Sequence, residues 1–317
     1  MKTVAILFCG MPRYFERCYQ SHLQFFDLDG YQFDYFIHCW EESRFWYDPK
    51  GGRFNSKENL EDRLKDTYNP KKIKVESQEE NNDLQLDFDA ISRLSKYYDF
   101  VGNIKEEDQY LIWKHFFSDK EKFLDRLHAG QLYSLEKVTN LKKEYENENN
   151  IRYDKVIRFR LDNVLDKHTD SEKDSIFKLN WFLDDDGNLI ERLDEGAKES
   201  DYVIFSHWCS FGEGGRPCIG DMFFGGSSYA FDCLCQDVYR FLIKSIMREL
   251  SSFKESEVCG WVPEAILAEK IIRDSAKLRC LSPVRQTPYR SFHLDGNQDY
   301  ETIHGKYLKQ LEGEDFL

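Results

Sequence analysis

Three apolar runs in the first part of the chain have the length and composition of buried strands. They are Thr3–Gly10, Phe33–Trp40 and the shorter Ile73–Val75. The first ends in glycine, and the other two are followed by acidic residues. Continuous apolar runs of this kind are typical of strands that are covered on both faces of a parallel sheet. A helical pattern over Tyr14–Phe26 separates the first two runs. The alternation of strand and helix predicts an α/β fold with a mostly parallel sheet and helices on both faces.

The middle of the chain continues this alternation. Glu76–Asp89 is acidic and poor in apolar residues, which predicts a mobile loop. Helical patterns follow over Asp108–Leu127 and Gln131–Asn147. The second of these leads into Tyr153–Asn163, where apolar and polar residues alternate as in a half-buried strand.

The second half of the chain has a different pattern. Two apolar pieces flank a turn signal at Asp184–Gly187, which predicts a hairpin over Asn180–Leu193. The further elements that we expect are a strand at Asp201–Phe205, a glycine-dense loop over 212–226, a long helix over Tyr229–Leu250, and a helix opened by Pro263 that ends near Ile272. No repeat or long linker interrupts the chain, so we expect one domain over residues 1–317.

Charge and cysteine usage narrow the classes of partner. The formal net charge is −14, which disfavours nucleic acid and anionic membranes as partners but leaves room for a local basic pocket that binds a small phosphorylated ligand. The nine cysteines form no CxxC pair, which favours free thiols in a reducing compartment. No apolar run has the roughly 18 residues of a membrane span. We therefore expect a cytoplasmic protein with no transmembrane segment.

The alternating segment Tyr153–Asn163 carries the most informative polar residues. Arg158, Arg160 and Asp162 are two residues apart, so in an extended strand all three side chains point to one side. One interpretation is an internal ion pair between arginine and aspartate. The other is a site in which the arginines bind a polyanion and Asp162 binds a cation. The segment alone leaves both open.

Polar groups also follow the other predicted strands. Ligands of open parallel sheets bind outside the carboxyl ends of the strands, where Gly10, Arg13 and His38 are expected. Neither a GxGxxG fingerprint nor a phosphate-binding loop with lysine follows the first strand. Arg13 is either a ligand for phosphate or a base edge, or part of a surface salt bridge. Asp162 is either a ligand of a hard divalent cation or a turn cap.

Two carboxylates in the second half are candidates for acid–base chemistry. Asp221 lies in the glycine-dense loop beside apolar residues, where it would act as a base or accept a hydrogen bond from a sugar hydroxyl. The alternative interpretation of the same sequence is an ordinary strand flanked by turns. Glu264 follows Pro263 and is equally well explained as favourable charge at a helix N-terminus. No Ser-His-Asp or Cys-His arrangement stands out.

Several of these segments together resemble a known family. They are the Gly10-Met-Pro-Arg13 turn, Asp34-Tyr-Phe-Ile-His-Cys-Trp40, Gln131-Leu-Tyr-Ser-Leu135, Tyr153–Asp162, and Gly220-Asp-Met-Phe-Phe-Gly-Gly-Ser227. The chain is similar to glycosyltransferases of bacterial lipopolysaccharide and capsule clusters, and similar proteins occur in large viruses. The resemblance implies a GT-A fold, which is Rossmann-like. In that fold a nucleotide sugar lies over the sheet, and an Asp-x-Asp carboxylate holds Mn²⁺ or Mg²⁺ against the diphosphate.

The resemblance assigns roles to the candidate residues. The Asp-x-Asp position reads Arg160-Leu-Asp162, so arginine replaces the first carboxylate and Asp162 is left as the single expected metal ligand. The residues expected to bind the donor are Gly10, Arg13, His38, Arg158, Arg160 and Asp162. Asp221 is the first choice for the base that takes the acceptor proton, with Glu264 second. The aromatics considered for stacking on sugar rings are Trp40, Trp46, Trp208 and Trp261.

The predicted reaction is transfer of a sugar from a nucleoside-diphosphate sugar to a hydroxyl of a glycan or a lipid-linked saccharide. Residues 1–165 would form the nucleotide-sugar-binding half, and residues 166–317 an elaborated acceptor half. The alternative is a catalytically silent protein that binds nucleotide sugars or glycans on the same scaffold, which the incomplete Asp-x-Asp motif favours. A nucleotidyltransferase is a weaker third hypothesis, because the glycine-rich loop with lysine is missing.

Overall fold

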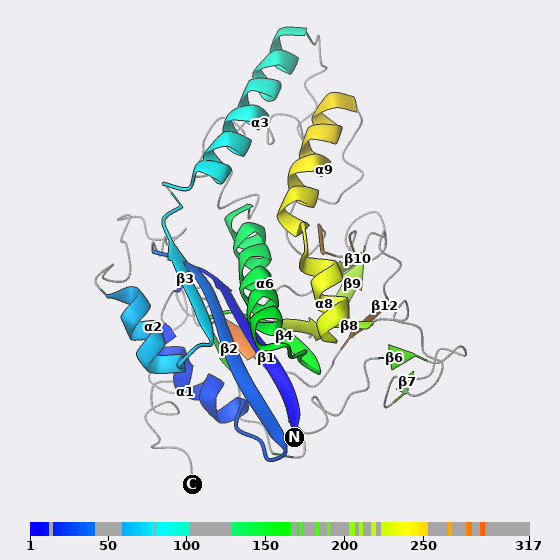
Figure 1. The fold of residues 1–317 in the computed structure, drawn as a ribbon. Coiled ribbons are helices and arrows are strands. Elements are labelled where there is room, and N and C mark those ends of the chain that lie inside the picture. Colours follow the sequence, from blue (N-terminus) through cyan, green and yellow to red (C-terminus); the bar gives the residue numbers. More distant parts are fainter. Residues whose placement is uncertain are drawn as a thin grey trace, which may run out of the picture.

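A computed structural model describes most of the first half of the chain and selected parts of the second half (Figure 1). The described residues are 1–12, 15–41, 59–78, 80–101, 129–165, 170, 173, 182–183, 189–190, 203–206, 209–211, 217–219, 223–252, 266–267, 270, 277–280 and 286–288. Among the helices in these ranges, none combines the length and the apolar character that crossing a bilayer requires.

A seven-stranded sheet forms the centre of the described structure. Its strand order is β12-β8-β11-β4-β1-β2-β3, and β11 is the single strand in it that runs antiparallel to its neighbours. The strands are β1 (Lys2–Gly10), β2 (Tyr31–Trp40), β3 (Lys72–Glu76), β4 (Lys155–Phe159), β8 (Val203–Ser206), β11 (Phe223–Gly226) and β12 (Lys277–Cys280). The mostly parallel sheet confirms the α/β prediction for this part of the chain.

Helices cover both faces of the sheet. On one face lie α1 (Phe15–Phe25) and α2 (Leu60–Tyr68), and on the other lie α6 (Ala129–Asn149) and α8 (Ser228–Cys235). The strand β1 shows why both faces need cover, since Val4, Ile6 and Phe8 pack on the α1 side whereas Leu7 and Cys9 pack on the α6 side. Such a strand reads as one unbroken apolar run.

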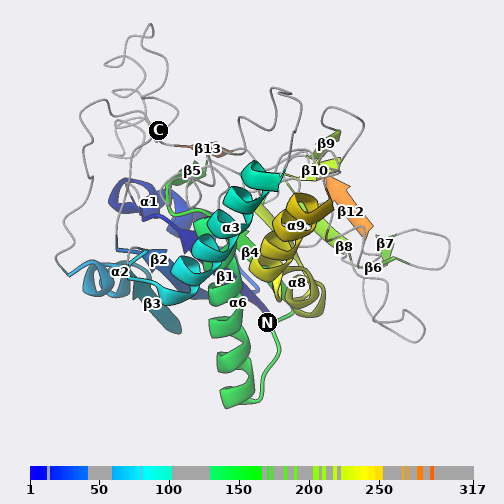
Figure 2. The ribbon, with the colours of Figure 1, turned by 90° about the horizontal axis from the view of Figure 1, so that it is seen from above.

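Two helices extend beyond the sheet together. Figures 1 and 2 show α3 (Asn82–Val101) and α9 (Val238–Ser252) side by side above the carboxyl ends of the strands. Small antiparallel pairs complete the described elements: β5 (Asn163–Leu165) with β13 (Gln286–Pro288), β6 (Phe182–Leu183) with β7 (Leu189–Ile190), and β9 (Cys209–Phe211) with β10 (Pro217–Ile219). The pair β6–β7 confirms the predicted hairpin.

Two predicted elements differ from the structure, and two others lie wholly or mostly outside the described residues. The loop predicted over Glu76–Asp89 was wrong, because α3 begins at Asn82 and buries Leu84 and Ile91 on one face. The helix predicted over Tyr229–Leu250 is two helices, α8 and α9, which are separated where Asp237 takes φ +56°. The helix predicted over Asp108–Leu127 lies outside the described residues, as does most of the helix predicted after Pro263.

Five cysteines of the described helices and strands are free thiols, as the sequence predicts. Cys9, Cys18, Cys39 and Cys235 are buried, and Cys233 is half-buried. Burial raises the pKa of the Cys39 thiol above its ordinary value, and it raises the pKa of Cys235 as well. These thiols therefore act as small apolar side chains in the core.

Candidate functional site at the carboxyl edge of the sheet

The order of the strands creates a switch point between β1 and β4. From β1 the chain passes through α1 to β2 and through α2 to β3, moving steadily away from β4. It then returns through α3 and α6 to place β4 on the other side of β1. Adjacent strands whose connections leave in opposite directions open a crevice at their carboxyl ends, and ligands of α/β sheets bind there.

Gly10 ends β1 at this switch point. Its φ is +105°, a conformation that L side chains rarely adopt, and no described atom lies within 4 Å of the position that a Cβ would take. The glycine is therefore required by the backbone conformation and not by lack of space. Its amide donates a hydrogen bond to Ser134 Oγ of α6 at 2.8 Å.

Arg158 of β4 is a buried cation beside Cys9, the residue before Gly10. It pairs in register with Leu7, and its Nε lies 3.3 Å from Cys9 Sγ, so the side chain extends toward the carboxyl edge. The guanidinium lies 5.8 Å from the centre of the Phe224 ring, and Arg158 is 1% exposed. Among the described atoms, Arg158 Nη1 has no hydrogen-bond partner. A buried guanidinium without a carboxylate is strongly disfavoured unless an anion joins it.

Arg160 and Asp162 form a closed ion pair. Arg160 Nε donates to Asp162 Oδ1 at 2.8 Å, and Nη2 donates to Oδ2 at 2.7 Å. Because β4 ends at Phe159, both residues lie in the turn beyond the strand, so the predicted alternation of three side chains on one strand face was wrong. The internal ion pair weighed from the sequence is confirmed.

The pair bears directly on the expected metal site. Both oxygens of Asp162 accept hydrogen bonds from a cation, and Asp162 is 1% exposed. No group of three or more metal-ligating side chains occurs in the described ranges. The described residues around Asp162 therefore do not fit Mn²⁺ or Mg²⁺ as they stand.

The turn after β4 is held from the other face of the sheet by His22, which the sequence did not single out. His22 Nε2 donates to the carbonyl of Asn163 at 2.5 Å, and Nδ1 accepts from the Tyr68 hydroxyl at 2.9 Å. Burial lowers the pKa of His22 to about 4, so the ring is neutral at neutral pH. The amide of Leu165 donates to Ser21 Oγ at 3.1 Å, so helix α1 holds both ends of β5, directly after this turn.

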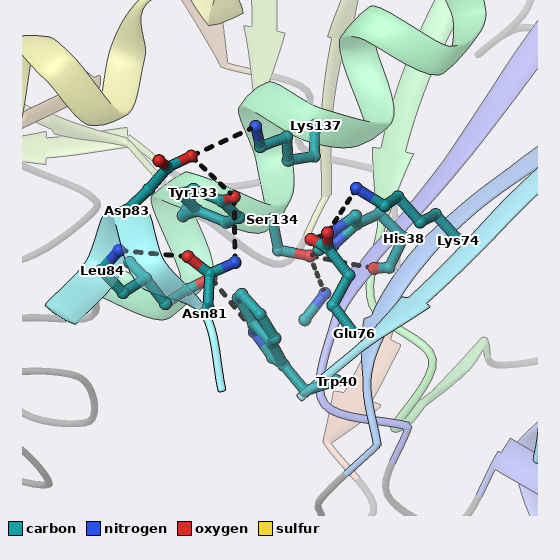
Figure 3. Close-up of polar contacts among 12 residues, drawn as sticks. His38, Trp40, Lys74, Glu76, Asn81, Asp83, Leu84, Tyr133, Ser134 and Lys137 are labelled. Atoms are coloured by element: carbon teal, nitrogen blue, oxygen red, sulfur yellow. Dashed lines mark hydrogen bonds and ion pairs between the residues drawn. The ribbon is translucent and has the colours of Figure 1, made fainter. Parts of the chain in front are cut away.

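His38, a predicted donor-binding residue, lies on β2 between Glu76 of β3 and Ser134 of α6 (Figure 3). It is fully buried, with Nε2 2.8 Å from Glu76 Oε2 and Nδ1 2.7 Å from Ser134 Oγ. The hydrogen bond from His38 lowers the pKa of Glu76 to about 2, and Lys74 pairs with the same carboxylate. Both ring nitrogens of His38 are thus used within the protein.

Trp40 is also buried, at 1% exposure. Its indole Nε1 donates to the carbonyl of Gly130 at 3.2 Å, and its ring stacks on Tyr133 with centroids 5.5 Å apart (Figure 3). The prediction that Trp40 is an exposed platform for sugar rings was wrong, because Trp40 is the last residue of β2 and packs against α6.

Several predicted site residues lie outside the described residues. They are Arg13, Asp221, Glu264, Trp46, Trp208 and Trp261. The strand that follows Asp221 is described, and β11 begins with Phe223 paired to Phe159 at the carboxyl edge. Within that strand, a Cβ on Gly225 would lie 2.5 Å from the carbonyl oxygen of Val156. Gly225 is therefore explained by close strand packing and not by approach to a ligand.

A second buried polar cluster lies near the start of β4, and sequence reasoning missed it. Lys142 Nζ lies 2.7 Å from Asp232 Oδ1 and 3.0 Å from Glu146 Oε2, and it donates to Ser228 Oγ at 2.6 Å. Glu146 also accepts the amide of Tyr153 at 3.0 Å. The cluster joins α6 to α8 and to the entry of β4. Arg152 lies 3.4 Å from Asp232 and 3.9 Å from Glu146, so two cations balance the two carboxylates and the cluster serves the structure. The spacing of four between Lys142 and Glu146 was its only sequence signal.

Comparison with known proteins adds no family assignment. No protein-family model matches the chain, and no curated protein matches its sequence.

Proposed function

We propose that the protein is a glycosyltransferase with a GT-A-like fold that uses a nucleoside-diphosphate sugar as donor. The observation that carries this proposal is Arg158, a buried guanidinium whose Nη1 has no partner among the described atoms, beside the switch point of a mostly parallel sheet. A diphosphate at this position would supply the missing negative charge. The open face of Gly10 leaves room for close approach of such a ligand.

The leaving group explains why a buried arginine is useful here. Breaking the bond between a sugar and a nucleoside diphosphate leaves negative charge on the diphosphate, and positive charge held in a water-poor site stabilises that charge. Arg158 is already desolvated, so it interacts with an anion more strongly than an exposed arginine does. Arg160 is neutralised by Asp162, so Arg158 is the first choice for this role.

On the acceptor side, the candidates for the catalytic base are the two carboxylates predicted from the sequence. Asp221 is proposed to take the proton of the acceptor hydroxyl, with Glu264 second. The support for Asp221 is that β11, two residues further along the chain, begins at the same edge of the sheet as the end of β4. Asp221→Asn should then reduce transfer by roughly 10²–10⁴-fold with little change in donor affinity, as expected for loss of a general base.

Substitution of Arg158 tests the binding site most sharply. Arg158→Met keeps an unbranched apolar side chain and removes the charge. If the arginine is retained for an anionic ligand, the free variant should be as stable as the wild type or more stable, because an unpaired buried charge has been removed. The same variant should lose stabilisation by nucleoside diphosphates in thermal unfolding.

The control is Arg152→Met, which removes an arginine near the start of β4. Arg152 is half exposed and lies 3.4 Å from Asp232. This variant should keep full nucleotide binding. If Arg158→Met instead unfolds the protein in the absence of nucleotide, Arg158 serves the structure and the proposal loses its support.

A second candidate function is favoured by the closed pair of Arg160 and Asp162. With both oxygens of Asp162 held by arginine, the site would suit a catalytically silent protein that binds nucleotide sugars. The two functions differ in one measurement. An enzyme releases free nucleoside diphosphate from its donor in the presence of acceptor, whereas a silent binder is stabilised by nucleotide without any release.

A further inference from the structure

A continuous chain of hydrogen bonds crosses the carboxyl edge of the sheet from β3 to β1. It begins at Glu76 on β3, passes through His38 on β2 and Ser134 on α6, and ends at the amide of Gly10 on β1 (Figure 3). The three donor–acceptor distances are 2.8, 2.7 and 2.8 Å. We call these four residues the edge chain. It links a partly exposed carboxylate to the residue at the switch point.

The donors and acceptors of the edge chain can be assigned, and all its hydrogen bonds run in the same direction. The pKa of Glu76 is lowered to about 2, so its carboxylate is ionised and only accepts, and His38 Nε2 must carry a hydrogen. Burial lowers the pKa of His38, which favours the neutral ring and leaves Nδ1 as an acceptor. The hydrogen of Ser134 then goes to Nδ1, and Ser134 Oγ accepts from the amide of Gly10.

The other acceptor within reach of Ser134 does not change this assignment. Ser134 Oγ also lies 2.9 Å from the carbonyl oxygen of His38. A hydroxyl has one hydrogen and can serve only one of the two acceptors. Leaving Nδ1 buried without a donor would be unfavourable, whereas the carbonyl of His38 belongs to a strand that is paired on both sides.

We propose that the edge chain positions Gly10 at the switch point, with Ser134 as the residue that holds the turn and Glu76 as the charge that polarises the chain. Hydrogen bonds that run in one direction strengthen one another, most of all in a buried site. The ionised carboxylate therefore tightens the bond from the Gly10 amide even though the two residues do not touch. The inference that Gly10 is held in place for nucleotide binding rests on the proposed function. The direction of the hydrogen bonds in the edge chain does not.

Other charged and titratable groups face the same region. Those around His38 are Lys74 on β3, Lys137 and Tyr133 on α6, and Cys9 on β1, with Asp83 of α3 4.0 Å from Lys137. Lys74 and Lys137 are cationic and oppose a proton on His38. They therefore support the neutral ring that the proposal requires.

Two pairs of variants test the edge chain. Glu76→Gln keeps an acceptor for His38 and removes the charge, and Asp83→Asn removes an exposed carboxylate that touches Lys137 but not His38. Ser134→Ala deletes the central hydroxyl, and Thr139→Ala deletes another buried hydroxyl of α6, which donates to the carbonyl of Leu135. The readouts are the ¹⁵N resonances of the His38 ring, the amide proton resonance of Gly10, and the affinity for uridine and guanosine diphosphate.

The proposal predicts a neutral His38 ring with its hydrogen on Nε2 in the wild type at neutral pH. Glu76→Gln should move the Gly10 amide resonance upfield, as a weaker hydrogen bond does, and Asp83→Asn should not. Ser134→Ala should move it further and weaken nucleotide affinity by about fivefold to tenfold, as loss of one hydrogen bond predicts. Thr139→Ala should leave both unchanged.

Two results would overturn the proposal: a hydrogen on Nδ1 of His38, or a Gly10 resonance that responds equally to the test and control variants. Failure of the proposed function looks different. If neither nucleotide binds the wild type, the glycosyltransferase proposal loses its donor site. The resonances of His38 and Gly10 still decide whether the edge chain exists.

Discussion

Acidification should destabilise the protein through His22, and the structure gives the size of the effect. The ring is fully buried, and its pKa is about 4 in the folded protein against 6.5 in an exposed chain. Between these values the unfolded chain binds a proton that the folded protein does not, so stability falls as pH falls from 6.5 toward 4. A pKa difference of about 2.5, at about 1.4 kcal/mol for each pH unit, gives a loss of about 3 kcal/mol.

Urea unfolding at a series of pH values measures this loss, and His22→Gln separates it from the contributions of other groups. The variant should be less stable at neutral pH because the Tyr68 hydroxyl and the Asn163 carbonyl lose their partner. Its stability should depend less on pH, so the gap to the wild type should narrow by about 3 kcal/mol between pH 6.5 and pH 4. A constant gap across this range would show that His22 keeps an ordinary pKa, and the interpretation of its burial would be wrong.

Three further substitutions test the packing around the site. Lys142→Met leaves two buried carboxylates without their shared cation, and the free energy of unfolding should fall by about 3–5 kcal/mol in chemical denaturation. Gly225→Ala places a methyl group against the carbonyl of Val156 and should destabilise by about 1–3 kcal/mol, with strand separation visible as lost amide protection. Gly10→Ala meets no atom but must hold a positive φ, so a cost of about 1–2 kcal/mol should appear in the same denaturation assay. A variant as stable as the wild type would contradict the role given to that residue: the shared cation for Lys142, the close strand contact for Gly225, or the positive φ for Gly10.

The sequence was sufficient for the central strands because their apolar runs report burial directly. Thr3–Gly10 and Phe33–Trp40 match β1 and β2 closely, and Gln131–Asn147 lies within α6. The first part of α3 was missed because its many acidic residues lower the average hydrophobicity of a segment whose apolar face is narrow. Average hydrophobicity over Glu76–Asp89 does not reveal a helix that packs on α9.

The candidate site was predictable only in part. Convergence of strand ends placed Gly10 and Arg158 at one edge, since this follows from the parallel sheet itself. The partners of His38 and His22 come from elements far away in the chain, and nothing local specifies them. The sequence also could not choose between a ligand and an ion pair for Asp162, because the choice depends on how the turn after β4 orients Arg160.

The most direct test of the central claim is release of free nucleoside diphosphate from a panel of nucleoside-diphosphate sugars, with glycan acceptors present. We predict release by the wild type and by Arg152→Met, and a loss of at least about 10²-fold in Arg158→Met, as expected when stabilisation of the leaving group is removed. Release that is unchanged in Arg158→Met would contradict the assigned site. A wild-type protein that neither binds nor consumes any member of the panel would contradict the proposed function.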